Sequence, residues 1–313
     1  MRFHLTDDQR ALRTGVRDLL ARRYGREALR ASVDAACGPG PGSGAGAAPG
    51  AVVDRGLWRE LGAAGFFALR LPEADGGVGL GLPEAALAFE EAGRALLPGP
   101  LVATHLAAGS VPGAARGTMV VTAFDLGGPL VTYLGEADAV LGHASLPPGE
   151  PVRPTDPLTP LHRVAPPSPG TAYDGLEEYR DEGSLLTAAL QLGGALRTVE
   201  LAVRYARERE QFGQPIGAFQ AVKHLCAGML VRAELARTAV YAAAVTADPG
   251  EIAGAKLLAD EAAVRNARDC LQVHGGLGFT WEADVHLYLK RAWVRAEQWR
   301  TVAEAEEFLA ERV

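Results

Sequence analysis

The chain has 313 residues, 48% of them hydrophobic, which is enough for one large domain or for two to three smaller ones. A net charge of -7 and the absence of a Lys/Arg-dense run argue against nucleic acid as a main partner. We find no secretory signal, no stretch of about 18 uncharged apolar residues and no metal-ligand spacing among the three cysteines, so we expect a cytoplasmic protein with reduced thiols and no membrane span.

The N-terminal third predicts three helices joined by loops. Thr6 to Gln9 form a capping box with acidic residues in the first turn, and the apolar face that follows continues a helix to about Gly25. Residues 38–50 are almost entirely Gly, Pro, Ala and Ser, so we expect a mobile loop there. A second helix is expected from Leu57 to Gly65 and a third from Pro83 to Leu96.

A glycine-rich segment, Leu71–Gly81, lies between the second and third of these helices. A phosphate-binding loop would need a GK[ST] sequence after a strand, and neither is present. We therefore interpret the segment as a tight connection between helices.

The middle of the chain differs in pattern from both ends. Thr118–Thr122, Pro129–Leu134 and Ala139–Leu141 are short β-branched or apolar runs between Gly and Pro residues, which predicts strands. Residues 147–170 are rich in proline, so we expect irregular structure there.

The C-terminal half is predicted to be helical. Ser184 is the expected N-cap of a long helix, in which Gly193-Gly194 allows close contact with another helix. Asp248-Pro249 starts a further helix, which ends at Gly275-Gly276. Two last helices are expected, at residues 284–290 and 293–312. Such helices bury their apolar stripes against one another, and we expect subunits to associate through them.

The junction after the long helix carries a candidate anion site. Arg207 and Arg209 lie together at the exposed helix end, and Phe212–Gly217 then breaks the helix because it contains Gly and Pro. Apolar residues at helical spacing resume from Phe219. A cationic fork beside an exposed aromatic suits a phosphate-bearing ligand, whereas the alternative for Arg209 is a solvated surface charge.

Two long motifs now make the sequence resemble the acyl-CoA dehydrogenase family. Arg209–Gln220 fits R-x-x-F-G-x-P-I-x-x-F-Q, and Gln272–Glu282 fits Q-x-x-G-G-x-G-F-[TN]-x-E. The N-terminal segments W-x-x-L, P-E-x-x-G-G-x-G-L, E-E-x-G-R and P-x-P also follow the family's order. The resemblance, to the short subunits of heteromeric members in particular, implies a mostly α fold with a small β-domain. We expect an N-terminal helical domain, a shortened middle β-domain and a C-terminal four-helix bundle, at residues 1–112, 113–182 and 183–313.

The resemblance implies FAD as the cofactor. Arg209 is expected to contact its pyrophosphate, with Phe212 and Gln220 near the adenine. The glycine pair Gly275-Gly276 would let the backbone approach FAD bound mainly by a neighbouring subunit, although an ordinary helix C-cap is the alternative. The full set of expected cofactor contacts is Arg209, Gln211, Phe212, Gln220, Gln272, Gly275 and Gly276. The family's T-E-P and W-I-[TS] segments, which hold the flavin ring, are absent.

The family also needs a carboxylate that removes the α-proton of the acyl group. Its two alternative positions correspond here to Trp299 and Gly183, neither of which is an acid. A shift of one residue selects Glu182 as the catalytic base, and a shift of two residues selects Glu297. The remaining interpretation is that a partner chain carries the base.

Three functions follow as hypotheses. The first is FAD-dependent α,β-dehydrogenation of a bulky or unusual acyl-CoA or acyl-carrier thioester, with a separate electron acceptor, by one subunit of a heteromeric enzyme or by a homo-oligomer. The second is a flavin-free thioester lyase or dehydratase, and the third is a non-catalytic scaffold. No HExxH, nucleophile elbow or metal cluster occurs, which disfavours hydrolases and metalloenzymes.

Overall fold

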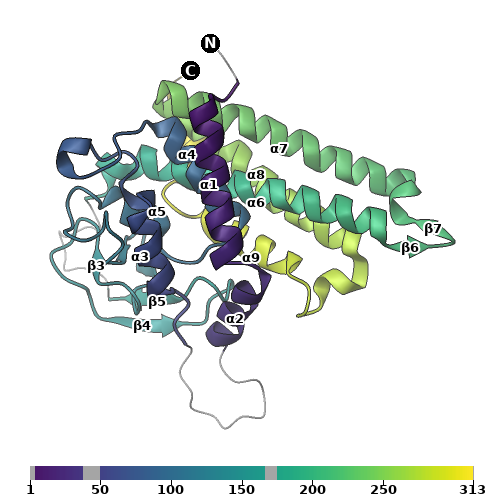
Figure 1. The fold of residues 1–313 in the computed structure, drawn as a ribbon, viewed down its shortest axis with the longest axis horizontal. Coiled ribbons are helices and arrows are strands. Elements are labelled where there is room, and N and C mark those ends of the chain that lie inside the picture. Colours follow the sequence, from purple (N-terminus) through teal and green to yellow (C-terminus); the bar gives the residue numbers. More distant parts are fainter. Residues whose placement is uncertain (1–3, 38–49, 166–174, 313) are drawn as a thin grey trace, which may run out of the picture.

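The computed structural model describes residues 4–37, 50–165 and 175–312 of the chain and is mostly helical, with short strands in the middle (Figure 1). This confirms the predicted fold class. The helices are α1 (Asp7–Arg23), α2 (Arg26–Cys37), α3 (Arg55–Ala63), α4 (Leu82–Arg94), α5 (Leu101–Leu106), α6 (Arg180–Glu208), α7 (Gln220–Thr246), α8 (Pro249–His274), α9 (Val285–Ala296) and α10 (Val302–Ala310). The predicted mobile loop at residues 38–50 lies outside the described residues except for Gly50.

The N-terminal helices begin where their capping residues require. Thr6 Oγ1 accepts a hydrogen bond from the Gln9 amide at 3.1 Å, and Gln9 Oε1 accepts one from the Thr6 amide at 3.0 Å, which confirms the capping box of α1. Helices α2 and α5 were not predicted. The first follows Gly25 directly and buries only Leu29 and Val33, and the second has six residues, too few for a clear period.

The strands β1 to β5 form two small sheets near one end of the helical bundle (Figure 1). β1 (Val121–Thr122) pairs in parallel with β3 (Ala139–Val140). β2 (Leu130–Thr132), β5 (Leu161–Val164) and β4 (Gly149–Val152) form an antiparallel sheet with β5 in the centre. The prediction of irregular structure over 147–170 is therefore wrong for β4 and β5, while 166–170 lie outside the described residues. The prolines, such as Pro151, were the reason for that prediction. An edge strand such as β4 nevertheless tolerates a residue without an N–H donor.

The long helices α6, α7 and α8 run side by side, with α9 against α6 and α8 (Figure 1). Helix α6 begins at Arg180, so Ser184 is not its N-cap. Instead Ser184 is buried inside the helix and its hydroxyl donates to the Arg180 carbonyl at 2.6 Å. Gly193 packs closely as predicted, since a Cβ there would lie 1.9 Å from the Glu90 carbonyl oxygen of α4. Asp248 caps α8 as predicted, accepting hydrogen bonds from the amides of the next residues.

The last two helices have different bounds from those predicted. Helix α9 continues to Ala296 through Arg291, which lies in the predicted break between the last two helices. Arg291 is buried, and the equally buried carboxylate of Asp156 accepts a hydrogen bond from its Nε, so this charge faces the core and does not end the helix. Residues 297–301 then connect α9 to α10. Among the described residues, we find no helix with the length and hydrophobicity needed to span a bilayer.

Candidate functional site

The predicted loop after α6 is a β-hairpin. Strands β6 (Glu210–Gln211) and β7 (Gln214–Pro215) pair antiparallel, and Phe212 and Gly213 between them both have positive φ, 55° and 76°. Two such residues make the tight turn that two-residue hairpins favour. The Phe212 side chain is 92% exposed at the tip. The hairpin projects beyond the bundle, away from the β-sheets (Figure 1).

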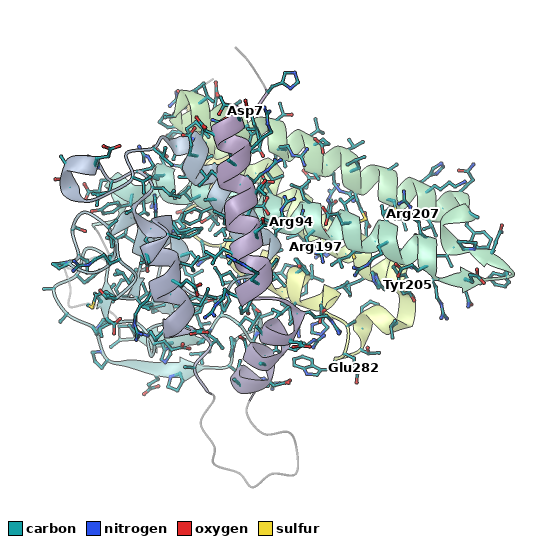
Figure 2. The ribbon with its side chains drawn as sticks, viewed as in Figure 1. Asp7, Arg94, Arg197, Tyr205, Arg207 and Glu282 are labelled. Atoms are coloured by element: carbon teal, nitrogen blue, oxygen red, sulfur yellow. The ribbon has the colours of Figure 1, made fainter. Side chains whose placement is uncertain are left out.

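The two sequence motifs meet at this hairpin end. The rings of Tyr205 on α6 and His274 on α8 stack with centroids 4.2 Å apart, which ties the end of α8 to the end of α6. His274 Nδ1 also lies 2.8 Å from the Cys270 carbonyl oxygen, and burial lowers the pKa of its ring. Figure 2 shows Tyr205 and Arg207 at this end of α6. All predicted cofactor contacts are exposed on this end: Arg209, Gln211, Phe212, Gln220, Gln272, Gly275 and Gly276.

The arginines and glycines at this end are open to contact from outside the chain. Arg207 and Arg209 form no ion pair with any described residue, so both guanidinium groups are free to bind an anion. Gly275 has φ of 59°, which favours glycine, but Gly276 does not have positive φ. A Cβ on either glycine would meet nothing within 4 Å. The backbone at Gly276 is thus open to a molecule from outside the chain, as a pyrophosphate contact requires.

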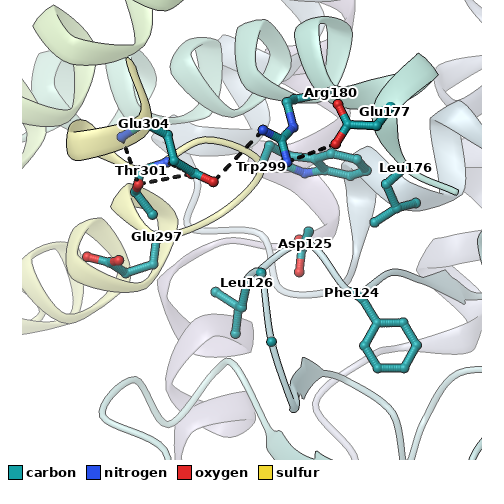
Figure 3. Close-up of a pocket in the computed structure, with 12 residues that line it drawn as sticks. Phe124, Asp125, Leu126, Leu176, Glu177, Arg180, Glu297, Trp299, Thr301 and Glu304 are labelled. Carbon is teal, nitrogen blue, oxygen red and sulfur yellow. Dashed lines mark hydrogen bonds and ion pairs between the residues drawn. The ribbon is translucent and has the colours of Figure 1, made fainter. Parts of the chain in front are cut away.

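A pocket of about 590 Å³ lies at the opposite end of α6 (Figure 3). It is lined by Arg180, by the loop after β1 and by the connection from α9 to α10. The full set is Phe124, Asp125, Leu126, Gly127, Gly128, Leu176, Glu177, Arg180, Glu297, Trp299, Thr301 and Glu304. Four carboxylates and one arginine give this wall an acidic balance, and Arg180 pairs with Glu177 at 3.1 Å and with Glu304 at 3.9 Å.

Both positions where the resemblance expects a base meet in this region. Trp299 is buried, and its ring lies directly over Gly183 of α6. A Cβ on Gly183 would be 2.3 Å from Trp299 Cδ2, so the ring occupies the space that any side chain on Gly183 would need. The indole thus occupies the space beside both positions at which the resemblance expects a carboxylate.

The two shifted candidates for the base lie elsewhere. Glu182 faces away from the large pocket, pairs with Arg70 and has Oε1 3.5 Å from His105 Nε2. Burial alone would raise the pKa of Glu182. The hydrogen bonds and charges of His105 and Arg70 together lower it by more, so the net pKa lies below its usual value. Such a carboxylate is a weaker base than a free one. Glu297 is exposed and lines the mouth of the large pocket.

Sequence reasoning missed Asp125, the residue of this pocket with the most perturbed environment. Its Oδ2 accepts a hydrogen bond from Gln298 Nε2 at 2.8 Å, while its Oδ1 is enclosed without a partner. Burial raises the pKa of Asp125 to about 7, although the hydrogen bond from Gln298 opposes this. The available signal was an acid three residues after the predicted strand Thr118–Thr122 and shortly before Gly127-Gly128.

The fit to FAD therefore differs between the two ends of α6. The hairpin end offers free cations and open backbone, which suit a pyrophosphate, whereas the pocket end lacks the T-E-P and W-I-[TS] segments and is acidic. Helix α6 has 29 residues, so at about 1.5 Å per residue its ends are about 43 Å apart. One dinucleotide cannot span that distance within a single chain.

Comparison with known proteins agrees with these features. Residues 6–119 match the acyl-CoA dehydrogenase N-terminal domain and residues 181–299 its C-terminal domain. The acyl-CoA dehydrogenase IpdE2 of Mycobacterium tuberculosis is 35% identical over 314 residues, covering 91% of this chain and 91% of that protein.

Two solved structures share the fold. A chain of the ChsE4-ChsE5 complex from Mycobacterium tuberculosis superposes with a TM-score of 0.81 at 24% identity, covering 100% of this chain and 98% of that one. The FAD complex of PigA superposes with a TM-score of 0.78 at 19% identity, covering 100% of this chain and 99% of that one. With both family domains matched and a relative aligned over nearly the whole length, this chain belongs to the acyl-CoA dehydrogenase family of oxidoreductases that act on acyl-CoA.

Proposed function

We propose that the chain is one subunit of a heteromeric, FAD-dependent acyl-CoA dehydrogenase and that its partner subunit supplies the catalytic base. The observation that carries this proposal is the Trp299 ring over Gly183, which fills both base positions of this chain. Glu182 pairs with Arg70 and lies close to His105, so we do not propose it as the base. A carboxylate from another chain is then needed for removal of the α-proton.

In this proposal the hairpin end serves a flavin held mainly by the partner. Arg209 would bind the pyrophosphate, Phe212 would cover the adenine, and the open backbone at Gly275-Gly276 would approach the phosphates from the other side. FAD, when bound, supplies the acceptor for the hydride that leaves the β-carbon. The distance of about 43 Å between the ends of α6 supports a site shared between chains, since the hairpin cannot serve the chain's own pocket.

The heteromeric form is also supported by a structural neighbour. The ChsE4-ChsE5 complex pairs two different chains, and a chain of that complex has the fold of this one. The substrate in our proposal is a bulky or unusual acyl group on CoA or on a carrier protein, and a separate protein accepts the electrons from the reduced flavin.

The first test is an absorption spectrum of the chain purified alone and with its nearest co-encoded relative. Our proposal expects visible flavin bands in the complex and none, or weak ones, in the lone chain. Strong bands in the lone chain would mean a self-sufficient flavin site and would return Glu182 and Glu297 to consideration. An absence of flavin from both samples would contradict the proposal.

A variant pair then tests the assigned contact. A hydrogen bond to a charged group contributes about 1.5 to 3 kcal/mol, so Arg209→Ala should weaken FAD retention by the complex about 10- to 150-fold. Arg265→Ala is the matched control, because Arg265 is an exposed arginine whose ion pair with Glu261 lies on the side of α8. Equal flavin loss in both variants would argue against a specific role for Arg209.

The second candidate function is a flavin-free lyase or dehydratase, with a scaffold subunit as its non-catalytic form. It is favoured by the acidic pocket and by the missing flavin-ring segments. If the complex with the relative contains no flavin, product analysis with acyl-CoA substrates separates the two: release or addition of water marks the lyase, and no turnover marks the scaffold.

A further inference from the structure

A separate pocket of about 490 Å³ lies between the N-terminal helices and the middle of the bundle. Its wall is formed by α1, α2, the end of α4, the C-terminal half of α6 and the start of α9. A pocket of this volume is large enough for a small-molecule ligand. It shares no lining residue with the large pocket or with the hairpin end, so the functions proposed for those sites leave it unexplained.

Arginine is the most frequent residue in the wall of this pocket. Five of the described arginines line it, and they come from four different helices: Arg17, Arg26, Arg94, Arg197 and Arg204. Figure 2 shows Arg94 and Arg197 near each other beside α1. The chain as a whole has a net charge of -7, so this cationic wall runs against its overall charge. A concave site lined by one sign of charge concentrates ligands of the opposite sign.

The carboxylates near these arginines are shared between them. Glu91 accepts two hydrogen bonds from Arg17, at 2.6 and 2.8 Å, and lies 3.7 Å from Arg94. Glu200 accepts hydrogen bonds from Arg94 at 2.6 Å and from Arg197 at 3.0 Å. Each of the two carboxylates therefore serves two guanidinium groups.

The same sharing occurs at the start of α9. Asp284 accepts a hydrogen bond from Arg26 at 2.7 Å and another from Arg30 at 2.6 Å. Arg204 is exposed and forms no ion pair with any described residue. The five pocket arginines and Arg30 thus have three carboxylates among them, which leaves an excess of three positive charges.

The wall between the arginines is apolar. Leu20 is buried and Leu201 is half-buried. The Tyr288 hydroxyl donates to the Arg94 carbonyl at 2.9 Å, so its aromatic ring is left as an apolar part of the wall. An inorganic anion would use the cations alone. A nucleotide would also place its planar base against these apolar side chains, while guanidinium groups bind its phosphate oxygens in pairs.

We propose that this pocket binds a nucleoside diphosphate, with Arg197 and Arg204 on its phosphates and its base against Leu20 and Leu201. A terminal phosphate carries about 1.5 to 2 negative charges at pH 7, so two phosphate groups together come close to the excess of cations. The ligand is a free nucleotide or the same group within coenzyme A. The inference does not rest on the proposed dehydrogenase function, because it uses no residue of the large pocket or of the hairpin end.

The test is isothermal titration calorimetry of the purified full chain with ADP as the probe. We expect one site per chain, with an affinity that falls as the salt concentration rises. Arg204→Ala removes a guanidinium group without an ion-pair partner among the described residues, so the chain should stay folded and bind ADP about 10-fold more weakly or worse. Arg59→Ala is the matched control, because Arg59 on α3 is likewise exposed and unpaired within the described part of the chain but does not line the pocket. No ADP binding, or equal losses in the two variants, would overturn the proposal.

Two further variants separate this pocket from the flavin contact. Glu200→Gln frees Arg94 and Arg197 from their shared carboxylate, so it should tighten ADP binding several-fold, and weaker binding would contradict the proposal. Arg209→Ala at the hairpin end should leave the ADP affinity unchanged, whereas Arg204→Ala should leave flavin retention by the complex unchanged. Loss of ADP binding in Arg209→Ala would place the nucleotide at the hairpin end and overturn the assignment to this pocket.

A comparison of ligands identifies what the pocket recognises. Inorganic phosphate should bind more weakly than ADP because it cannot reach the apolar wall, and equal affinities would contradict a nucleotide site. Coenzyme A that binds more tightly than ADP, and is weakened by Arg204→Ala, would identify the carrier as the source of the nucleotide. Weaker or equal binding would identify a free nucleotide. The titration is repeated with the complex, where loss of ADP binding would assign the pocket to the partner contact and overturn the proposal.

Discussion

Gly183 and Trp299 occupy the two positions at which the family resemblance expects a base. Gly183 has no side chain and the Trp299 ring fills the space beside it, so an acidic side chain cannot be placed at Gly183 while the ring is there. A single acidic substitution at Gly183 would meet the indole at 2.3 Å. In the proposed function, this packing keeps a base out of the Gly183 position.

This packing predicts that a side chain at Gly183 destabilises the protein. Gly183→Ala places a Cβ against the indole, and overpacking of this kind costs about 1 to 3 kcal/mol of unfolding free energy. In a Trp299→Val background the same change should cost much less, because the ring is gone. Chemical denaturation of the two single variants and the double variant measures this coupling. Additive effects would show that the two residues do not compete for the same space.

Gly254 provides the matched control for that experiment. It also lies inside a long helix, but a Cβ there would meet nothing within 4 Å. Gly254→Ala should therefore stabilise the protein by about 0.5 to 1 kcal/mol, because alanine loses less backbone freedom on folding. A loss of stability at Gly254 as large as at Gly183 would assign the effect to helix disruption in general.

The raised pKa of Asp125 predicts that the stability of the protein depends on pH. Its pKa rises from 3.8 to about 7 on folding, so between these values the folded state binds more protons than the unfolded state. Its contribution to stability is therefore fully present below about pH 4 and is lost as the pH rises through 7, by at most about 1.4 kcal/mol per pH unit. Asp125→Asn should remove this slope, as measured by unfolding at several pH values. Equal slopes in the wild type and the variant would contradict the raised pKa.

At the scale of elements, the hairpin retains a strained residue at an exposed tip. Phe212 has φ of 55°, where asparagine is more favourable, and its side chain packs only edge-to-face against Phe219 at 6.1 Å. Phe212→Asn should stabilise the free chain by about 1 kcal/mol in thermal unfolding and weaken flavin retention by the complex. Unchanged flavin retention would show that Phe212 has no part in cofactor binding.

Helix α9 depends on a buried ion pair rather than on a surface one. Asp156→Ala leaves the buried Arg291 guanidinium without its carboxylate, which should cost about 3 to 5 kcal/mol. Glu200→Ala removes the half-exposed partner of Arg94 and should cost about 1 kcal/mol or less. Urea unfolding of both variants checks the difference. Equal losses would mean that the burial of the first pair does not matter to α9.

The elements that local chemistry specifies were predictable from the sequence. The capping box at Thr6 and the Asp248-Pro249 start located their helices, and the two family motifs located the hairpin end of the site. Strands β4 and β5 were missed because the prolines around them suggested irregular structure. The contacts of Asp125 with Gln298, and of Gly183 with Trp299, join distant segments, so no local pattern could reveal them. The domain boundaries at 112 and 182 stay a prediction.

At the scale of the whole molecule, our proposal gives the two ends of α6 different functions: one end contacts a cofactor held by another chain, and the other end lines the chain's own pocket. In that proposal, the hairpin end would present cations and open backbone to a neighbouring chain, and the acidic pocket end would receive its base from the partner. The proposed enzyme needs a partner chain, and exposed apolar side chains agree with such an assembly. On α7 the exposed apolar side chains are Leu230, Val231, Leu235 and Val245, with exposed fractions of 48%, 58%, 57% and 58%.

The exposed apolar face of α7 predicts where the subunits contact each other. Replacing Val231 and Leu235 together by glutamate puts two charges into an apolar face, so assembly through the C-terminal helices should be lost because unpaired charges resist burial. Sedimentation velocity of the purified complex should then show separate chains, each still folded by circular dichroism. Leu146→Glu is the control, since Leu146 is 41% exposed but lies among the strands, and it should leave assembly intact. A complex that persists with both charges on α7 would place the subunit contact on another face of the molecule.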